Sequence, residues 1–213
     1  MQLLSEISTP LQPHEISFLS DHSKDVPGRL EVQPLEIPDV ILIRTRRFSD
    51  ARGYFCETYH RADFAAHGLV YDFLQDNQSS SIRPGTVRGL HFQRPPFAQT
   101  KLVRVLHGRI FDVAVDLRHS SRTFGKHVGV ELSSDDNTQL LIPRGFAHGF
   151  CTLEPDTVVF YKVDQVYSAA NDGGIYCADD RLGIEWPVGS DHVILSERDR
   201  RLPMLADLGP VFD

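Results

Sequence analysis

The stretch that decides the fold is KLVRVLHGRIFDVAVDL, residues 101–117. Apolar residues alternate with other types on both sides of its centre, most clearly from Phe111 to Leu117. Such period-two alternation is typical of a β-strand. His107 and Gly108 separate the two alternating halves and predict a two-residue hairpin turn. The stretch therefore predicts two consecutive strands that belong to a hydrophobic core.

Strand-like segments continue on both sides of this stretch. Turn signals separate them about every eight to twelve residues, a spacing typical of an all-β sandwich or barrel. Helix is expected only in one turn at 61–67 and in a short C-terminal segment at 196–207. There, Ser196 is a plausible N-cap and Asp199 occupies the third helical position. The other expected strands are 40–48, 54–59, 71–77, 87–93, 126–132, 139–142, 150–153 and 158–166.

The 213 residues are enough for one sizeable domain with an arm. Residues 1–36 hold four of the thirteen prolines and show no sustained periodicity. We therefore interpret 1–36 as an N-terminal extension, either an arm or a partly disordered segment, and 37–213 as the domain.

Bulk properties exclude several classes of function. The formal net charge of −7 argues against a nucleic-acid partner. No apolar run approaches the length of a membrane span, and the N-terminus lacks the pattern of a secretory signal. The three cysteines are isolated in the sequence, as expected for small buried side chains in a cytoplasmic protein.

The segment GTVRGLHFQ, residues 85–93, predicts a strand that carries a histidine, His91. A histidine that points into a cavity is a common general base near neutral pH. Strict alternation predicts that Arg88, Leu90 and Phe92 share one face. It places Val87, Gly89, His91 and Gln93 on the other.

Two short motifs suggest a cupin-type jelly roll. Gly85 followed by His91 resembles the first cupin motif, and PRGFAH, residues 143–148, resembles the second. Metal-binding cupins place another histidine two residues after the first, where this chain has Gln93, and a carboxylate beyond it. No Asp or Glu occurs between Gln93 and Gly108. Two histidines alone make a poor ligand set, so we predict no metal.

Longer segments resemble the dTDP-4-dehydrorhamnose 3,5-epimerases. These are FSDARGYFCE (48–57), VRGLHFQ (87–93), KLVRV (101–105), FDVAVDLR (111–118), IPRGFAHGF (142–150) and LGIEWP (182–187). The similarity runs from about residue 38 to about residue 204, and the extension lies outside it. The resemblance implies a jelly-roll homodimer that acts on a dTDP-4-keto-6-deoxy sugar without any cofactor.

The chemistry of such an epimerase requires a base, an acid and a cation. Hydrogens at C3 and C5 are acidic because both carbons flank the C4 carbonyl, and their removal gives an enolate. The resemblance implies that His91 is the base, that Asp199 orients it, and that Tyr161 is the acid. Lys101 is the candidate that stabilises the enolate oxygen.

The same resemblance implies residues that hold the substrate. Arginines suit a diphosphate, and an aromatic face suits the base. In the family, the two most N-terminal of these residues reach into the neighbouring subunit. His148 is open to two interpretations, packing or ligand contact, and we expect a contact. The matching positions are Arg52, Glu57, Gln75, Asn77, Arg88, His148, Tyr167, Asp172 and Arg198.

The expected function is therefore epimerisation of dTDP-4-dehydro-6-deoxy-D-glucose at C3 and C5, which gives dTDP-4-dehydro-L-rhamnose. One alternative is a 3-epimerase of an unusual-deoxysugar pathway, since it uses the same three catalytic residues. A second is a non-catalytic cupin that binds sugar nucleotides, and a third is a metal cupin. The sequence does not reveal whether one stereocentre or two are inverted.

Overall fold

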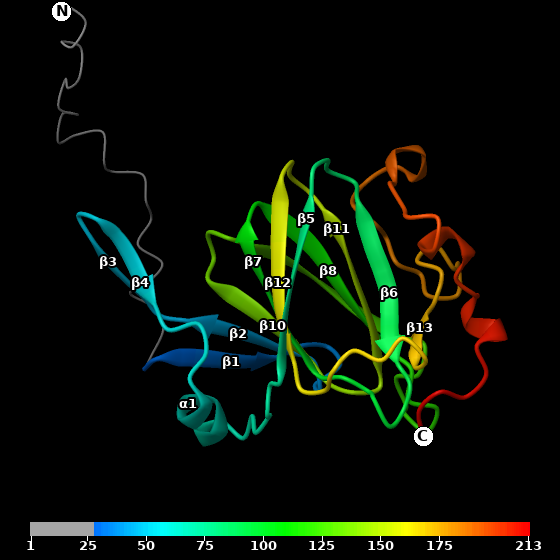
Figure 1. Ribbon diagram of the computed structural model, residues 1–213, viewed down its shortest axis with the longest axis horizontal. Helices are drawn as coiled ribbons and strands as arrows, with labels where there is room; N and C mark the ends of the chain where they lie inside the picture. The colour runs from blue at the N-terminus through cyan, green and yellow to red at the C-terminus, as the bar shows by residue number, and fades with distance from the viewer. Residues whose placement is uncertain (1–27) are drawn as a thin grey trace, which may run out of the picture.

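Two antiparallel sheets face each other in the computed structural model, which describes residues 28–213 (Figure 1). One sheet has six strands in the order β1-β2-β10-β7-β12-β5, and the other has five in the order β13-β6-β11-β8-β9. The all-β sandwich expected from the sequence is confirmed. None of the helices in the described part of the chain has the length and apolar character needed to cross a membrane.

The strands of the larger sheet are β1 (Leu30–Pro34), β2 (Ile41–Thr45), β10 (Thr138–Ile142), β7 (Lys101–His107), β12 (Thr157–Val163) and β5 (Gln75–Ser81). Those of the smaller sheet are β13 (Asp172–Gly174), β6 (Val87–Gln93), β11 (Phe146–Thr152), β8 (Arg109–Asp116) and β9 (His127–Ser133). A separate hairpin comprises β3 (Arg47–Asp50) and β4 (Gly53–Cys56). The helical pieces are α1 (Arg61–Ala66) and three 3₁₀ turns, η2 (Ser190–His192), η3 (Asp199–Arg201) and η4 (Leu205–Asp207).

Strand β8 is buried on both faces, so Asp112 and Asp116 are buried along with its apolar residues. Ile110 and Ala114 pack between the two sheets. Val113 and Val115 face the opposite way and pack against the segment that follows β13, residues 175–213, which includes Ile175. That segment runs along the outside of the smaller sheet beside β6 (Figure 1). The period-two alternation predicted for this strand is confirmed.

The turn at His107 and Gly108 was predicted as a hairpin, and this prediction is wrong. β7 and β8 belong to different sheets, so the chain crosses the sandwich there. Gly108 has φ of +79° and an added Cβ would lie 2.6 Å from the Thr157 hydroxyl oxygen. Glycine is therefore required for the crossing, by its backbone freedom and by the close approach of β12.

Several element boundaries also differ from the sequence prediction. The expected strand 40–48 divides at Arg46 into β2 and β3, and the segment 71–77 becomes a strand only at Gln75. The expected C-terminal helix is reduced to two 3₁₀ turns. Pro203 accounts for the break between them, because a residue before proline favours the extended conformation that Leu202 adopts.

Strand β6 does not alternate as predicted, because a β-bulge interrupts it. His91 lies opposite His148 and Arg88 lies opposite Phe150, so three steps on β6 match two on β11. A bulge shifts the alternation of side chains by one residue. Arg88 and His91 therefore both face the larger sheet, and Arg88 Nε donates a hydrogen bond to Ser81 Oγ at 3.1 Å.

Part of the segment expected as an N-terminal extension or arm is ordered against the domain. Residues 30–34 fall inside the segment expected as an extension, yet they form β1 and pair along its length with β2. β1 is therefore the edge strand of the larger sheet and pairs with the domain on one side. Residues 1–27 of the predicted extension lie outside the described residues.

Candidate active site

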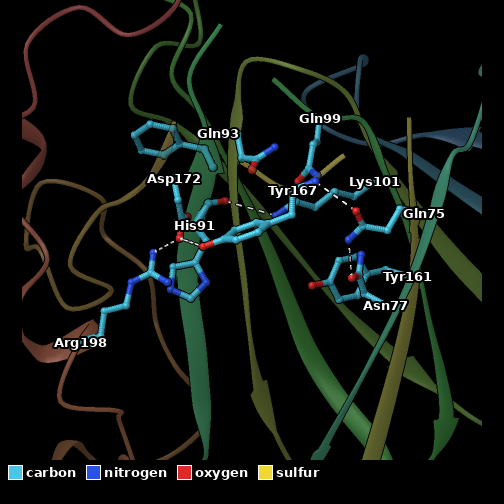
Figure 2. Close-up of a pocket in the computed structure, with 11 residues that line it drawn as sticks. Gln75, Asn77, His91, Gln93, Gln99, Lys101, Tyr161, Tyr167, Asp172 and Arg198 are labelled. Carbon is cyan, nitrogen blue, oxygen red and sulfur yellow. Dashed lines mark hydrogen bonds and ion pairs between the residues drawn. The ribbon is translucent and has the colours of Figure 1, made fainter. Parts of the chain in front are cut away.

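A cavity of about 210 Å³ opens between the sheets, where β6 ends and β7 begins. Its walls come from both sheets and from the loops before β13 and η3 (Figure 2). Eight of the site residues expected from the sequence line it. They are Gln75, Asn77, His91, Lys101, Tyr161, Tyr167, Asp172 and Arg198.

His91 projects from β6 and is backed by a buried carboxylate. Its Nε2 lies 2.7 Å from Asp199 Oδ1, and the Asp199 residue is 4% exposed. Burial raises the pKa of Asp199, but bonds from His91, from the Gly89 N–H and from Ser196 outweigh it, so the pKa is lowered overall. An ionised carboxylate only accepts hydrogen bonds, so His91 carries its proton on Nε2. In the neutral form of this tautomer, Nδ1 has a free lone pair.

Ser196 was predicted as the N-cap, but the 3₁₀ turn η3 begins later and its N-cap is Arg198. Ser196 still accepts a hydrogen bond from the Asp199 N–H at its hydroxyl oxygen, at 3.0 Å. The Asp199 carboxylate bonds to His91 instead of capping the turn. The short 3₁₀ turn at η3 thus presents the carboxylate to β6.

Tyr161 projects from β12 in the other sheet, on the far side of the cavity from His91 (Figure 2). Burial raises its pKa, while Arg88 lowers it and Asp172 raises it further. The net upward shift keeps the phenol protonated over the neutral pH range, so its O–H is available as a proton donor.

Lys101 is the first residue of β7, and it is buried although a strand start is usually exposed. Its Nζ donates a hydrogen bond to the backbone oxygen of His91 at 3.3 Å. Burial lowers the pKa of Lys101 to about 8, against the attraction of Asp112 and Asp172. The result is a cation that is poorly solvated and free to respond to a new negative charge.

Three side chains form a linked group at the mouth of the cavity (Figure 2). The Tyr167 hydroxyl donates to Asp172 Oδ2 at 3.1 Å, and Arg198 Nη2 lies 2.6 Å from the same oxygen. Tyr167 is 57% exposed, so the face of its ring is open to a ligand.

Residues of β5 complete the opposite wall. Gln75 Nε2 donates to Asn77 Oδ1 at 2.8 Å, which fixes the two amides relative to each other. Arg88 lies beside this wall, where its Nη2 donates to the Ser80 backbone oxygen at 2.8 Å. It does not line the cavity, but its charge lowers the pKa of Tyr161.

Three predicted site residues lie away from the cavity. His148 is 6% exposed and bonds to Asp112 Oδ1 at 2.6 Å, and burial lowers its pKa despite that carboxylate. Its position fits packing better than the expected ligand contact. Arg52 on the β3–β4 hairpin bonds to Asp50, and Glu57 bonds to Arg29.

The donor set does not favour a metal centre. No group of three His, Cys, Asp or Glu side chains with metal-binding geometry occurs within residues 28–213. The two histidines of the cupin motifs instead each bond to a carboxylate, Asp199 for His91 and Asp112 for His148. That the reaction needs no cofactor stays a prediction.

The cavity also contains residues that sequence reasoning did not assign to the site, namely Phe92, Gln93 and Gln99. Gln93 was considered only as a missing metal ligand. The available signal was its position two residues after His91 in a predicted strand, because side chains two residues apart lie on the same face.

The profile of the dTDP-4-dehydrorhamnose 3,5-epimerase family matches residues 34–207. A dTDP-4-dehydrorhamnose 3,5-epimerase of Sinorhizobium fredii is 51% identical over 176 residues, which cover 83% of this chain and 90% of that protein.

Solved structures agree with this match. A dTDP-4-dehydrorhamnose 3,5-epimerase from Bacillus anthracis, with TDP and PPi bound, superposes with a TM-score of 0.80 at 50% identity, covering 82% of this chain and 99% of that one. A dTDP-6-deoxy-D-glucose-3,5-epimerase from Legionella pneumophila, in complex with dTDP-4-keto-L-rhamnose, gives a TM-score of 0.80 at 38% identity and covers 84% and 94%.

Proposed function

Because this chain belongs to the dTDP-4-dehydrorhamnose 3,5-epimerase family, we propose that acid–base chemistry between His91 and Tyr161 carries its reaction. It is an isomerase that converts dTDP-4-dehydro-6-deoxy-D-glucose to dTDP-4-dehydro-L-rhamnose. The observation that supports this mechanism best is the placement of the two groups. They project from opposite sheets into one cavity, as inversion at a carbon requires of a base and an acid.

In the first step, the free lone pair of His91 Nδ1 takes the proton from C3 or C5. The electrons of the broken C–H bond move into the ring and leave negative charge on the C4 oxygen. Asp199 stabilises the imidazolium that forms, because its carboxylate is held on Nε2 at 2.7 Å.

In the second step, the Tyr161 hydroxyl delivers a proton to the opposite face of the same carbon. The enolate electrons return to that carbon and restore the C4 carbonyl. His91 then loses its proton and Tyr161 regains one by exchange with solvent, which resets the site for the second stereocentre.

Lys101 acts on the intermediate. Its ammonium is already desolvated in the free protein, so little reorganisation is needed when the enolate oxygen becomes negative. Removing one such preorganised donor typically reduces turnover by about 10²–10³-fold.

The nucleotide occupies the mouth of the cavity in this proposal. Arg198 and Arg88 provide the cations for the diphosphate, and the exposed ring of Tyr167 stacks on thymine. Gln75 and Asn77 offer amides to the base or the sugar. Relatives with bound TDP or a dTDP-linked sugar support a dTDP-linked ligand.

We further propose that the active unit is a homodimer. The β3–β4 hairpin exposes Phe48, Tyr54 and Phe55, at 48%, 58% and 65% of their surface. Phe48 and Phe55 are cross-strand partners whose ring centroids lie 6.5 Å apart, and an exposed aromatic surface of this kind is typical of an interaction site. Arg52 lies on this hairpin and Glu57 directly follows it, so a neighbouring subunit is the way for them to reach a cavity.

A cytoplasmic location is also part of the proposal. All three cysteines, Cys56, Cys151 and Cys177, are free thiols. Thiols stay reduced in the cytoplasm, where disulfides are rare.

Incubation with dTDP-4-dehydro-6-deoxy-D-glucose in D₂O, followed by NMR of the sugar, tests the function. We expect deuterium at both C3 and C5, together with the product dTDP-4-dehydro-L-rhamnose. Exchange at C3 alone would identify a 3-epimerase instead. Ligand binding without any exchange would identify a binding protein and refute the mechanism.

A further inference from the structure

The loop of residues 165–168 carries Tyr167 over the mouth of the cavity and has little apolar anchoring. Val166 and Tyr167 are 44% and 57% exposed. Loops with few buried contacts open easily. Four backbone groups of this loop are nevertheless bound by three glutamine side chains from other parts of the chain.

Gln93 makes the largest contribution to this arrangement. Its Oε1 accepts the Ser168 N–H at 2.6 Å, and its Nε2 donates to Val166 O at 3.1 Å. Nε2 also donates to Phe97 O at 2.8 Å. The side chain is 4% exposed, so these bonds form away from solvent and fix the amide in one orientation.

Gln99 and Gln75 hold the loop from two further directions. Gln99 Nε2 donates to Gln165 O at 2.7 Å, and Gln75 Oε1 accepts the Tyr167 N–H at 3.0 Å. Gln75 belongs to β5 and Gln93 to β6, so the loop is attached to both sheets. Figure 2 shows the three amides around the base of the Tyr167 side chain.

The other end of Tyr167 is held as well. Its hydroxyl donates to Asp172 Oδ2, the oxygen that also pairs with Arg198. Backbone and hydroxyl are therefore both fixed, and the ring face is what remains free. A ring fixed in this way before binding loses little conformational entropy when a ligand stacks on it.

We propose that Gln93, assisted by Gln99 and Gln75, is a positioning residue for nucleotide binding that acts through the 165–168 loop and the Tyr167 ring. The inference rests on the proposed function, in which Tyr167 stacks on thymine. When only a fraction of molecules holds the binding-competent loop, the apparent Kd rises by the inverse of that fraction. The glutamines raise this fraction, whereas the proton transfers at His91 and Tyr161 do not depend on it once substrate is bound.

The test compares wild type with Gln93→Leu and Gln93→Glu. The leucine removes all three bonds, and a glutamate carboxylate accepts from Ser168 N–H but does not donate to Val166 O or Phe97 O. We expect the Kd for dTDP, measured by titration calorimetry, and the KM for the dTDP-4-keto sugar to rise about tenfold. We expect kcat to change less than about threefold.

A double-mutant cycle with Tyr167→Ala separates positioning from general damage. If Gln93 acts through the ring, Gln93→Leu adds no further loss of dTDP affinity once Tyr167 is alanine. Additive losses would overturn the proposal, as would a fall in kcat with unchanged KM.

Thr152→Val provides a matched control. The buried Thr152 hydroxyl donates to Arg83 O at 2.9 Å and accepts the Thr86 N–H at 3.1 Å, so it also ties down a loop, at the opposite end of β6. We expect it to lower the melting temperature without changing Kd. An equal rise in Kd for this variant would refute a specific role of Gln93.

Gln99→Leu gives a milder version of the experiment if Gln93→Leu does not fold, because it removes a single bond. A Kd equal to that of wild type would then count against the proposal. The dTDP titration also separates failure of the proposed function from failure of the positioning role of Gln93. Wild type that binds no dTDP refutes the proposed function, whereas binding that the glutamine variants leave intact refutes the positioning role alone.

Discussion

Replacing Lys101 with methionine should stabilise the fold while it damages catalysis. Burial moves the pKa of Lys101 from 10.5 to about 8. This difference of about 2.5 pH units corresponds, at 1.36 kcal/mol per unit, to about 3 kcal/mol of unfavourable free energy for the charged lysine in the folded state. The figure already includes the attraction of Asp112 and Asp172, because both contribute to the pKa. Methionine has a similar shape and carries no charge.

The gain should depend on pH in a defined way. Below pH 8 both the folded and the unfolded wild type carry the proton, so the full penalty applies and the variant is favoured by about 3 kcal/mol. Between pH 8 and pH 10.5 the folded state releases the proton first, and wild-type stability rises relative to the variant. At pH 10 the remaining difference should be about 1 kcal/mol.

Urea unfolding at pH 7 and pH 10, at one fixed protein concentration, measures this difference. A gain of about 3 kcal/mol raises the melting temperature by roughly 6–12 °C for a protein of this size. Lys126→Met is the matched control, because Lys126 is exposed. If both variants were equally stable at pH 7, or if the gain from Lys101→Met were the same at both pH values, the reasoning from burial would be refuted.

Four further predictions concern the reaction. Turnover should fall as the pH rises through about 8, because Lys101 loses the charge that stabilises the enolate; a pH profile of kcat without this limb would contradict that role. Asp199→Asn should lower kcat by about 10²–10⁴-fold with the fold intact, which circular dichroism and NMR turnover assays check together. His91→Ala should lose both product and deuterium exchange, whereas Tyr161→Phe should lose product and keep exchange with retained configuration, since the base still acts; equal loss in both variants would argue against two separate roles. Mixing the inactive variants Arg52→Ala and His91→Ala should restore about a quarter of wild-type activity if Arg52 completes the partner's cavity, because half of the dimers then have one intact site; no recovery would place Arg52 in its own subunit's site.

The sequence predicts the layers of this fold better than its connections. The alternation in residues 111–117 correctly predicts a strand, because successive side chains of β8 pack into different clusters on its two faces. The link at Gly108 was misjudged, since a short turn between strands looks the same whether it stays in one sheet or crosses to the other. Local sequence does not record which sheet a strand joins.

The limits of periodicity are clearest in β6. Strict alternation separates Arg88 from His91, yet the bulge opposite β11 brings both to the face of the larger sheet. Bulges arise from pairing with a neighbouring strand, so they are not visible in one segment alone. His91 and Asp199 are likewise 108 residues apart, and only the family resemblance connected them before the structure did.

The role of Gln93 was not predicted from the sequence. It occupies the position at which metal cupins have a histidine ligand, so from the sequence alone it argues only against a metal. In the structure its amide bonds to Phe97 O, Val166 O and Ser168 N–H, and so connects the catalytic strand to the loop that carries Tyr167. An imidazole has two ring nitrogens and would not reproduce these three bonds. The same position thus suits either a metal ligand or an attachment point for the loop that carries Tyr167, and the three amide bonds of Gln93 favour the second.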